Sequence, residues 1–257
     1  ELMTQKYGKV AKKVPILPEV VTYNEFKESI NKNEIMIGID KSTLKPVTVN
    51  FNNYLINTIQ TLDLSLIENI INPLIYQFSK NINNLCIVIN SADISISEEL
   101  KTSTKYYDSN FDGVFDMLLK YLNDSVDLYE NSKNNISIFS SRKKIKCIII
   151  GPSEFKNKLS YDRQEKLEEL FNKGNNLDLI KYIFIDTNDK LNNLNYDEWY
   201  KSKTSSTDTI WIGNGISDQY LITISNRLEE MRKDIPSNFG FVVKKGKAVY
   251  VKFVEEI

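Results

Sequence analysis

The stretch that decides the fold is Ile145-Lys-Cys-Ile-Ile-Ile150, a nearly continuous apolar run. Strands of a parallel sheet are covered by helices on both faces, so their sequences lack the alternation of a half-exposed strand. Residues 85–89 and 180–185 are short apolar runs of the same kind. We therefore expect all three segments to be buried strands of an α/β sheet.

Segments with helical periodicity alternate with these strands. Apolar residues recur at helical spacing in residues 64–78, 111–129 and 162–171, which predicts amphipathic helices. Residues 54–59 and 209–212 are strand-like and extend the alternation. A strand–helix–strand order of this kind predicts a doubly wound α/β sheet.

Turn residues divide the two ends of the chain into shorter elements. Residues 35–39 and 47–51 predict one β-hairpin, and residues 239–243 and 248–253 predict another, with Gly246 in its turn. Three further expectations are weaker patterns: a capping box at Thr22, a β-rich segment at 220–224 and a short helix at 226–233.

The domain organisation follows from the same reading. Residues 1–18 are basic and contain Pro15 and Pro18, which is typical of an N-terminal linker. Residues 19–257 contain no internal repeat and no long low-complexity segment, so we expect a single domain. The chain begins Glu-Leu-Met rather than with an initiator methionine, which suggests a piece of a longer protein.

Charge argues against nucleic acid as the main partner. The 257 residues carry 33 basic and 34 acidic side chains, a net charge of −1, whereas proteins that track a duplex usually have a basic excess. The basic clusters Arg142-Lys143-Lys144 and Lys244-Lys245-Gly246-Lys247 are short. We interpret both as solvated turns.

The composition also excludes several kinds of site. The chain has no histidine, which removes Ser-His-Asp catalysis and most zinc sites. Its two cysteines, Cys86 and Cys147, lie within apolar runs and are expected to be buried thiols. Without histidine, and with both cysteines in apolar runs, we expect no metal site. No run approaches 18 apolar residues, so we expect no membrane span.

The order of elements resembles a known family. Leu17-Pro-Glu, Gly38-Ile-Asp40, Gly213-Asn-Gly-Ile-Ser-Asp-Gln219 and Phe239-Gly-Phe-Val-Val fall in that order from about residue 14 to the end. Together they resemble the FtsK/SpoIIIE-type ATPase modules of type VII secretion motors, and among these the C-terminal third module of an EssC protein of the type VIIb system.

That resemblance implies a fold and a setting. The fold would be a RecA-like P-loop ATPase core with a mainly parallel sheet, helices on both faces and a C-terminal β-hairpin. The parent would be an ATPase at the cytoplasmic side of the cell membrane, anchored through another part of the polypeptide, with this fragment itself soluble. Its expected partners are other ATPase domains of the same chain, in a hexamer, and secreted helical-hairpin substrates. ATP and Mg²⁺ would be bound by those other domains.

The segment where the family has its phosphate loop lacks the necessary residues. A P-loop needs glycines that let backbone N–H groups approach phosphates, a lysine for the β- and γ-phosphates, and a Ser or Thr for Mg²⁺. Here the segment from Thr58 to Asn69 has no Gly, Lys or Arg, and residues 46–79 have none either. It carries Asp63 and Glu68, which would repel a triphosphate, and Ser65, interpreted as a helix cap or surface residue. We therefore predict no nucleotide site, cofactor or catalytic residue in this domain.

Two other carboxylates follow predicted strands. Glu154 stands beyond Gly151-Pro152, where a Walker-B aspartate would be expected. Asp186 directly follows the predicted strand of residues 180–185. It therefore stands at the carboxyl end of a strand, where the ligand sites of α/β proteins form. For Asp186 we favour a bond to its own turn at Thr187 over a catalytic role.

An interface with neighbouring modules is the remaining site hypothesis. Its candidates are Trp199, Tyr200, Gly213, Asn214, Gly215, Asp218 and Gln219. For Trp199 the alternative is that its ring packs back on the sheet.

The sequence thus favours a non-hydrolysing ATPase-like module that serves docking, coupling or regulation in protein export. Two alternatives remain open: an active motor domain, for secretion or DNA translocation, with an atypical phosphate loop, and an unrelated α/β interaction domain.

Overall fold

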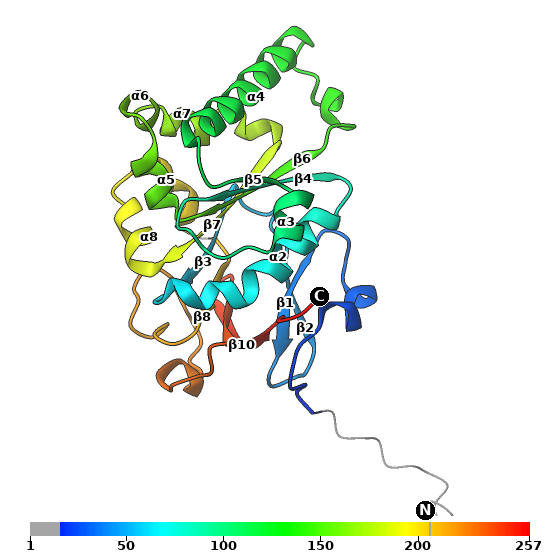
Figure 1. Cartoon of the computed structure of the whole chain (residues 1–257), viewed down its shortest axis with the longest axis vertical. Helices are drawn as coiled ribbons and strands as arrows, with labels where there is room; N and C mark the ends of the chain where they lie inside the picture. Colours follow the sequence, from blue (N-terminus) through cyan, green and yellow to red (C-terminus); the bar gives the residue numbers. More distant parts are fainter. Residues whose placement is uncertain (1–15, 206) are drawn as a thin grey trace, which may run out of the picture.

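The computed structural model describes residues 16–205 and 207–257. Of the N-terminal linker predicted for residues 1–18, all but the last three residues lie outside the described part. Within that part ten strands form one sheet in the order β2-β1-β10-β9-β8-β3-β7-β6-β4-β5 (Figure 1). The six strands from β8 to β5 in this order pair in parallel, and the four from β2 to β9 are antiparallel.

The apolar runs of the sequence form the parallel strands. In chain order these are β3 (Ile56–Thr61), β4 (Asn84–Asn90), β5 (Lys105–Tyr107), β6 (Lys144–Ile150), β7 (Ile180–Thr187) and β8 (Thr209–Ile212). From Ile145 to Ile150 every side chain of β6 is buried, as expected for a strand covered on both faces. The two predicted hairpins are β1 (Ile35–Asp40) with β2 (Pro46–Val49), and β9 (Phe239–Lys244) with β10 (Lys247–Phe253).

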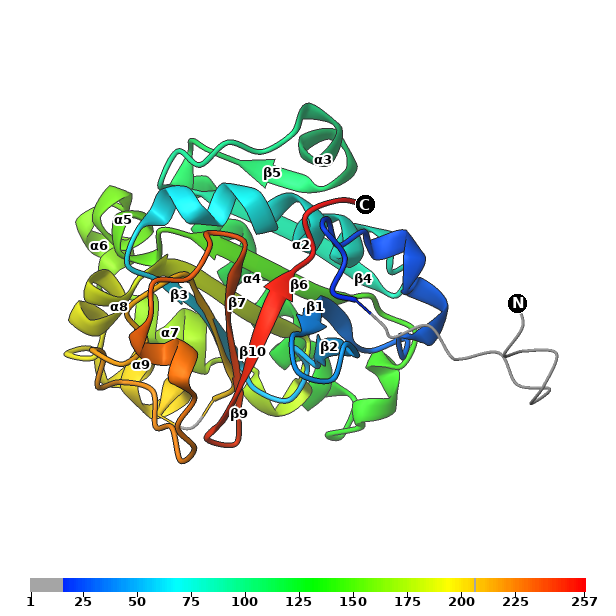
Figure 2. The ribbon, with the colours of Figure 1, turned by 90° about the horizontal axis from the view of Figure 1, so that it is seen from below.

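Helices cover both faces of the sheet (Figures 1 and 2). Ile59, Ile148 and Ile183 pack under α2 (Glu68–Lys80) and α3 (Glu98–Ser103) on one face. The other face carries α4 (Phe111–Asn131), α5 (Pro152–Lys158), α7 (Leu167–Asn172), α8 (Asn188–Leu194) and α9 (Glu198–Thr204). The predicted RecA-like α/β class with a C-terminal hairpin is confirmed. Cys86 and Cys147 are buried free thiols, as predicted.

Three weaker local predictions are wrong, each because a tertiary contact prevails. Residues 220–224 form no strand, since the Gln219 side chain bonds both the N–H (2.6 Å) and the carbonyl (3.0 Å) of Ile222 and fixes a loop. Residues 226–233 contain only a 3₁₀ turn (Glu229–Arg232), because the Asn226 amide pairs with the Ala248 backbone beside β10.

The capping box at Thr22 also fails. The Thr22 side chain makes no cap bond, and only two 3₁₀ turns follow, Tyr23–Glu25 and Lys27–Ser29. The Tyr23 N–H instead donates to the Glu256 carbonyl at 2.8 Å. A bridge to the C-terminus thus replaces the helix start.

The helical spacing of apolar residues did not predict the shortest helices correctly. Residues 162–171 form two pieces, α6 (Tyr161–Gln164) and α7, rather than one helix. The segments α3, α5, α8, α9 and β5 were not predicted. Each is eight residues or fewer, too short for a periodic pattern to develop.

Helix α9 carries a buried aromatic cluster that includes two of the interface candidates. Trp199 stacks on Phe171 with ring centroids 4.4 Å apart, and Tyr200 is parallel to Phe184 at 6.0 Å. Trp199 is only 8% exposed and Tyr200 2%. Both rings pack back on the sheet, which for Trp199 is the alternative to an interface role.

The burial of Trp199 gives a first prediction. Trp199→Ala should lower the free energy of unfolding by about 3–5 kcal/mol, since it leaves a large cavity beside Phe171. Chemical denaturation monitored by circular dichroism measures the loss. Tyr196→Ala, at a side chain 92% exposed, is the control and should change stability by no more than about 0.5 kcal/mol. Equal stability of the two variants would contradict the assignment.

Candidate functional site

The connections of the sheet place its crevice at the carboxyl ends of β3 and β7. The chain leaves β3 toward α2 on one face and leaves β7 toward α8 on the other. Ligands of open α/β sheets bind where adjacent strands diverge in this way. Gln60 and Asp186 are register partners at this point. The segment after β3 is therefore where a phosphate loop would lie.

The segment after β3 forms a turn that is capped by the carboxylate of one of its own residues. A 3₁₀ turn (Leu64–Ile67) leads into α2, and Asp63 is its cap. The Asp63 carboxylate accepts from the Ser65 N–H at 3.0 Å and from the Ser65 hydroxyl at 2.8 Å, which lowers its pKa. The start of a helix attracts anions. Here the chain supplies the anion itself, and Ser65 is occupied in the cap.

Leucines fill the space beside the turn. Gly213 (φ +75°) and Gly215 (φ +86°) bring the loop after β8 against it. A Cβ on Gly213 would lie 2.7 Å from Leu66 Cδ1, and one on Gly215 would lie 2.3 Å from Leu62 Cδ1. Only glycine permits both the positive φ and this approach. The two glycines of the predicted interface thus pack against the phosphate-loop segment.

The remaining interface candidates shape the same loop. Asn214 accepts through its backbone carbonyl from Trp211 Nε1 (2.8 Å) and through Oδ1 from the Ile235 N–H (2.7 Å). Asp218 is exposed, and its N–H donates to the Gly215 carbonyl at 3.0 Å. Gln219 fixes the next turn through Ile222. The turn that the sequence predicts at Gly213-Asn214-Gly215 is present, and the interface role of these residues stays a prediction.

Asp186 is buried at the crevice. Its Oδ1 accepts from the Thr187 N–H at 2.8 Å, the bond to its own turn that the sequence favoured. Burial raises its pKa to about 6, and the nearby Glu154 carboxylate adds to the rise, whereas the Thr187 bond and Lys190 oppose it. A carboxyl of this kind changes charge close to neutral pH.

Glu154 forms an ion pair with Lys190 across α5 and α8. Within the described residues, four acceptor oxygens at or beside the crevice have no hydrogen-bond donor: Gln60 Oε1, Glu154 Oε2, Asp186 Oδ2 and Asn188 Oδ1. Gln60 and Asn188 were missed by sequence reasoning, since a lone amide carries no signal. Acceptors of this kind suit water or a donor group and would repel phosphate oxygens.

A second hollow lies between α8, α9 and the loop after β8. It has a volume of about 780 Å³ and is lined by Tyr196, Tyr200, Tyr220 and Ile222, among others. Tyr196 is 92% exposed and Tyr220 is 76% exposed. The Tyr220 hydroxyl accepts from the Asn192 amide, which fixes its ring at the rim. We call this hollow the tyrosine groove.

Among the described residues, no group of three or more Asp, Glu or Cys side chains is arranged to share a metal ion. In the same part of the chain, no helix combines the length and apolar character needed to cross a bilayer.

Known structures share this fold at low sequence identity. The cytoplasmic domain of EssC aligns over 100% of this chain and 51% of its own, with 11% identity and a TM-score of 0.67. Thermomonospora curvata EccC (ATPases 2 and 3), in complex with a signal sequence peptide, aligns over 98% and 46%, with 15% identity and a TM-score of 0.59. The pCW3 conjugation coupling protein TcpA, in its monomer form with ATPγS, aligns over 93% and 71%, with 11% identity and a TM-score of 0.63.

The chain spans about half the length of the EssC chains that it matches. No family model matches the sequence, and no curated protein does. The likeness therefore shows the fold, an ATPase fold shared with type VII secretion proteins.

The raised pKa of Asp186 gives a second prediction. In the unfolded chain a carboxyl titrates near 3.9, whereas in the folded chain Asp186 holds its proton until about pH 6. The unfolded state therefore loses this proton first as pH rises, and the wild type loses stability between these values.

Asp186→Asn removes the loss of folding stability that accompanies ionisation of Asp186. The stability of the variant relative to wild type should rise by about 2–3 kcal/mol from pH 4 to pH 7, at 1.36 kcal/mol per pKa unit. Urea unfolding at both pH values measures it. Asp189→Asn, at an exposed position of α8, is the matched control. The same pH dependence in both variants would refute the assignment to Asp186.

Proposed function

We propose that this chain is an ATPase-like module of a type VII secretion motor that does not hydrolyse ATP and serves substrate docking, coupling or regulation. The observation that carries the proposal is a complete ATPase fold whose phosphate-loop segment is an aspartate-capped leucine turn. A module without catalytic activity would act through its contacts with other proteins.

The secretion setting is supported by the neighbours as a group. Two EssC structures and two EccC structures cover 98–100% of this chain. Their titles describe cytoplasmic domains or ATPases 2 and 3. By analogy, the partners of this module would be other ATPase domains of the same polypeptide, in a membrane-anchored hexamer. Those domains would supply ATP and Mg²⁺ binding.

The lack of hydrolysis is supported by three features of the loop. The Asp63 carboxylate caps the turn where phosphate would sit, Leu62 and Leu66 line it, and no lysine occurs between residues 46 and 79. Phosphoryl transfer depends on positioning and on cationic stabilisation of the phosphates. A carboxylate and two leucines provide neither.

Docking is the role best supported on the surface. One EccC neighbour was solved with a signal sequence peptide, and we propose the same class of ligand here. The tyrosine groove is the best candidate site, because Tyr196 and Tyr220 are large, exposed aromatic side chains at the rim of a hollow. Aromatic anchors of this type dominate peptide affinity.

An active motor domain is the second candidate. It is favoured by the position of Asp186 and Glu154 at the crevice, where Asp186 changes charge near pH 6. The coupling protein TcpA, solved with ATPγS, shares the fold, which keeps DNA translocation within this alternative. The net charge of −1 opposes it.

A hydrolysis assay separates these candidates. We expect the domain to release no phosphate from ATP–Mg²⁺ above a protein-free blank, because residues 46–79, where the phosphate loop would lie, contain no lysine or arginine to hold the γ-phosphate. The Asp186→Asn and Glu154→Gln variants should be equally inactive. Turnover in the wild type that either substitution abolishes would contradict the proposal and support the motor domain.

Peptide binding tests the docking role. A fluorescent signal-sequence peptide of a type VII substrate should bind the wild type, and Tyr196→Ala or Tyr220→Ala should weaken binding by about tenfold, the cost of losing an aromatic anchor. Tyr161→Ala, at a 72% exposed tyrosine on α6, is the matched control. Absence of wild-type binding, or equal loss in the control, would argue against this groove.

A further inference from the structure

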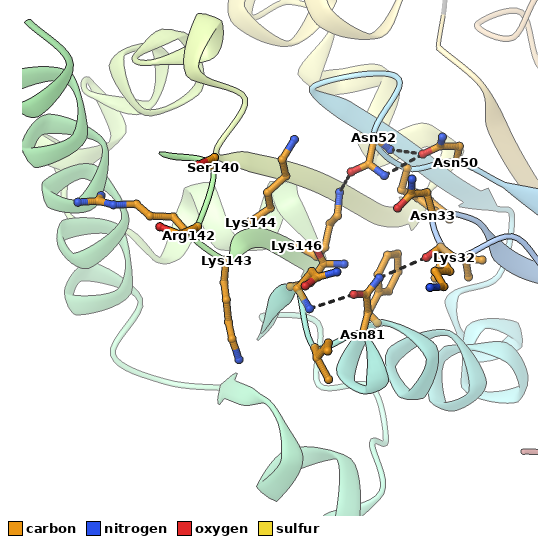
Figure 3. Close-up of a pocket in the computed structure, with 17 residues that line it drawn as sticks. Lys32, Asn33, Asn50, Asn52, Asn81, Ser140, Arg142, Lys143, Lys144 and Lys146 are labelled. Atoms are coloured by element: carbon orange, nitrogen blue, oxygen red, sulfur yellow. Dashed lines mark hydrogen bonds between the residues drawn. The ribbon is translucent and has the colours of Figure 1, made fainter. Parts of the chain in front are cut away.

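A cationic pocket lies at the edge of the sheet opposite the phosphate-loop segment (Figure 3). It opens at the amino ends of β4 and β6 and has a volume of about 570 Å³, within the usual range for small-molecule sites. Its walls come from the loop before β1, the loop after β2, the end of α2 and the segment before β6. We call it the amino-edge pocket.

All the charged residues that line this pocket are positive. They are Lys32, Arg142, Lys143, Lys144 and Lys146. Among the described residues, no aspartate or glutamate lines it. A cleft with one sign of charge and low-dielectric walls concentrates ions of opposite charge. This local excess contrasts with a net charge of −1 for the whole chain. The cluster Arg142-Lys143-Lys144, interpreted from sequence as a solvated turn, forms one wall.

Lys146 is the centre of the pocket. Its side chain points toward Asn52 in Figure 3, and its Nζ donates to Asn52 Oδ1. The residue is only 1% exposed, and no carboxylate within the described part lies within ion-pair distance of it. Burying an ammonium group without an opposite charge is costly.

Lys252 is a second buried lysine, and its ammonium group has several oxygen partners. It is 6% exposed, and its Nζ donates to the carbonyls of Pro18 (2.9 Å) and Glu19 and lies 3.8 Å from Glu255. Lys252 thus has three oxygen partners, one of them charged. Lys146 has one neutral partner in the described part of the chain.

The neighbouring charges do not compensate the cost of burying the Lys146 ammonium group. Asp178, the nearest acid among its electrostatic neighbours, already pairs with Lys144 and with Lys181 at 2.7 Å. Burial, together with the charges of Lys181 and Lys144, lowers the pKa of Lys146 to about 7, and Asp178 opposes this shift only in part. Close to neutral pH, Lys146 is thus able to gain a proton when an anion arrives.

The other walls suit a small ligand. Asn33, Asn50, Asn81 and Asn84 supply amide groups, and Phe51 and Phe78 form an edge-to-face pair at 5.3 Å beneath. Figure 3 shows the side chains of Lys143, just before β6, and Lys144, its first residue, extending in opposite directions, while Arg142 is directed toward α4 and bonds Ser125 at 3.4 Å. Because the Lys144 ammonium pairs with Asp178, Lys143 and Lys32 are the rim lysines without an ion-pair partner among the described residues.

We propose that the amino-edge pocket binds a small soluble anion that carries phosphate groups, with the Lys146 ammonium as its buried contact and Lys143, Lys144 and Lys32 at the rim. This site is separate from the phosphate-loop segment and does not depend on the proposed secretion role. Its structural alternative is that Lys146 only anchors the loop of Asn52.

Metal-free inorganic pyrophosphate is the probe. Isothermal titration of the intact chain at low salt should show saturable binding. Lys143→Glu, at an exposed rim position, and Lys146→Met should each weaken it by about tenfold or more, because each removes a charge-assisted contact. Lys120→Gln, which removes an exposed charge on α4 outside the pocket, should leave it unchanged. If Lys146→Met fails to fold, Asn52→Asp replaces it, since a carboxylate beside Nζ competes with the ligand.

The pH dependence identifies Lys146. Pyrophosphate becomes more negative as pH rises, so rim lysines alone would bind it more tightly. Deprotonation of Lys146, whose pKa lies at about 7 in the folded chain, predicts weaker binding between pH 6 and pH 8.5. Lys146→Met should remove this decline.

Three results would overturn the proposal. They are no pyrophosphate binding by the wild type, equal loss in Lys120→Gln, and binding that is insensitive to both Lys143→Glu and Lys146→Met. A fourth arm uses vesicles of phosphatidylcholine with phosphatidylinositol 4-phosphate. Co-sedimentation that depends on Lys143 without pyrophosphate binding would assign the basic rim to a membrane surface and overturn a soluble ligand.

Discussion

Strand β3 pairs in parallel with β7 from Ile56 to Thr61 on one side and with β8 from Thr58 to Thr61 on the other. The rest of the structure depends on this pairing, because it places the first core strand between two later ones. Helices α2 and α8 must then leave adjacent strands on opposite faces, which buries both faces and forces the strands to be apolar. The same geometry creates the crevice at the carboxyl edge.

The segment after β3 lies where a phosphate loop would be expected, but it has a different structure. In place of exposed backbone N–H groups there is a turn capped by Asp63, and in place of a lysine there are Leu62 and Leu66 against Gly213 and Gly215. The fold survives this loss because stability comes from the two hydrophobic layers, to which a phosphate loop contributes little. A module built this way remains able to present surfaces, and the tyrosine groove, with Tyr196 and Tyr220 exposed at its rim, is one of them.

The two edges of the sheet differ sharply in charge. The carboxyl edge carries Asp63, Glu154 and the buried Asp186, whereas the amino edge carries Lys146 and the lysines around it. Strand β6 joins them, with Lys146 near its start and Gly151 just beyond its end. An overall charge near zero therefore conceals a cation-lined pocket at one end and acidic groups at the other.

The sequence by itself determined the α/β class, the two hairpins, the long helix α4 and the absence of Gly, Lys and Arg from residues 46–79. Each rests on a local property: an apolar run, a period, a turn residue, or the absence of Gly and Lys over a whole segment. Only the tertiary structure decided that Trp199 is in the core, that Gln60 joins Asp186, and that Asn52 meets Lys146 across 94 positions of the chain. The physical reason is that burial and pairing depend on which distant segments the sheet brings together, and a one-dimensional pattern does not contain that information.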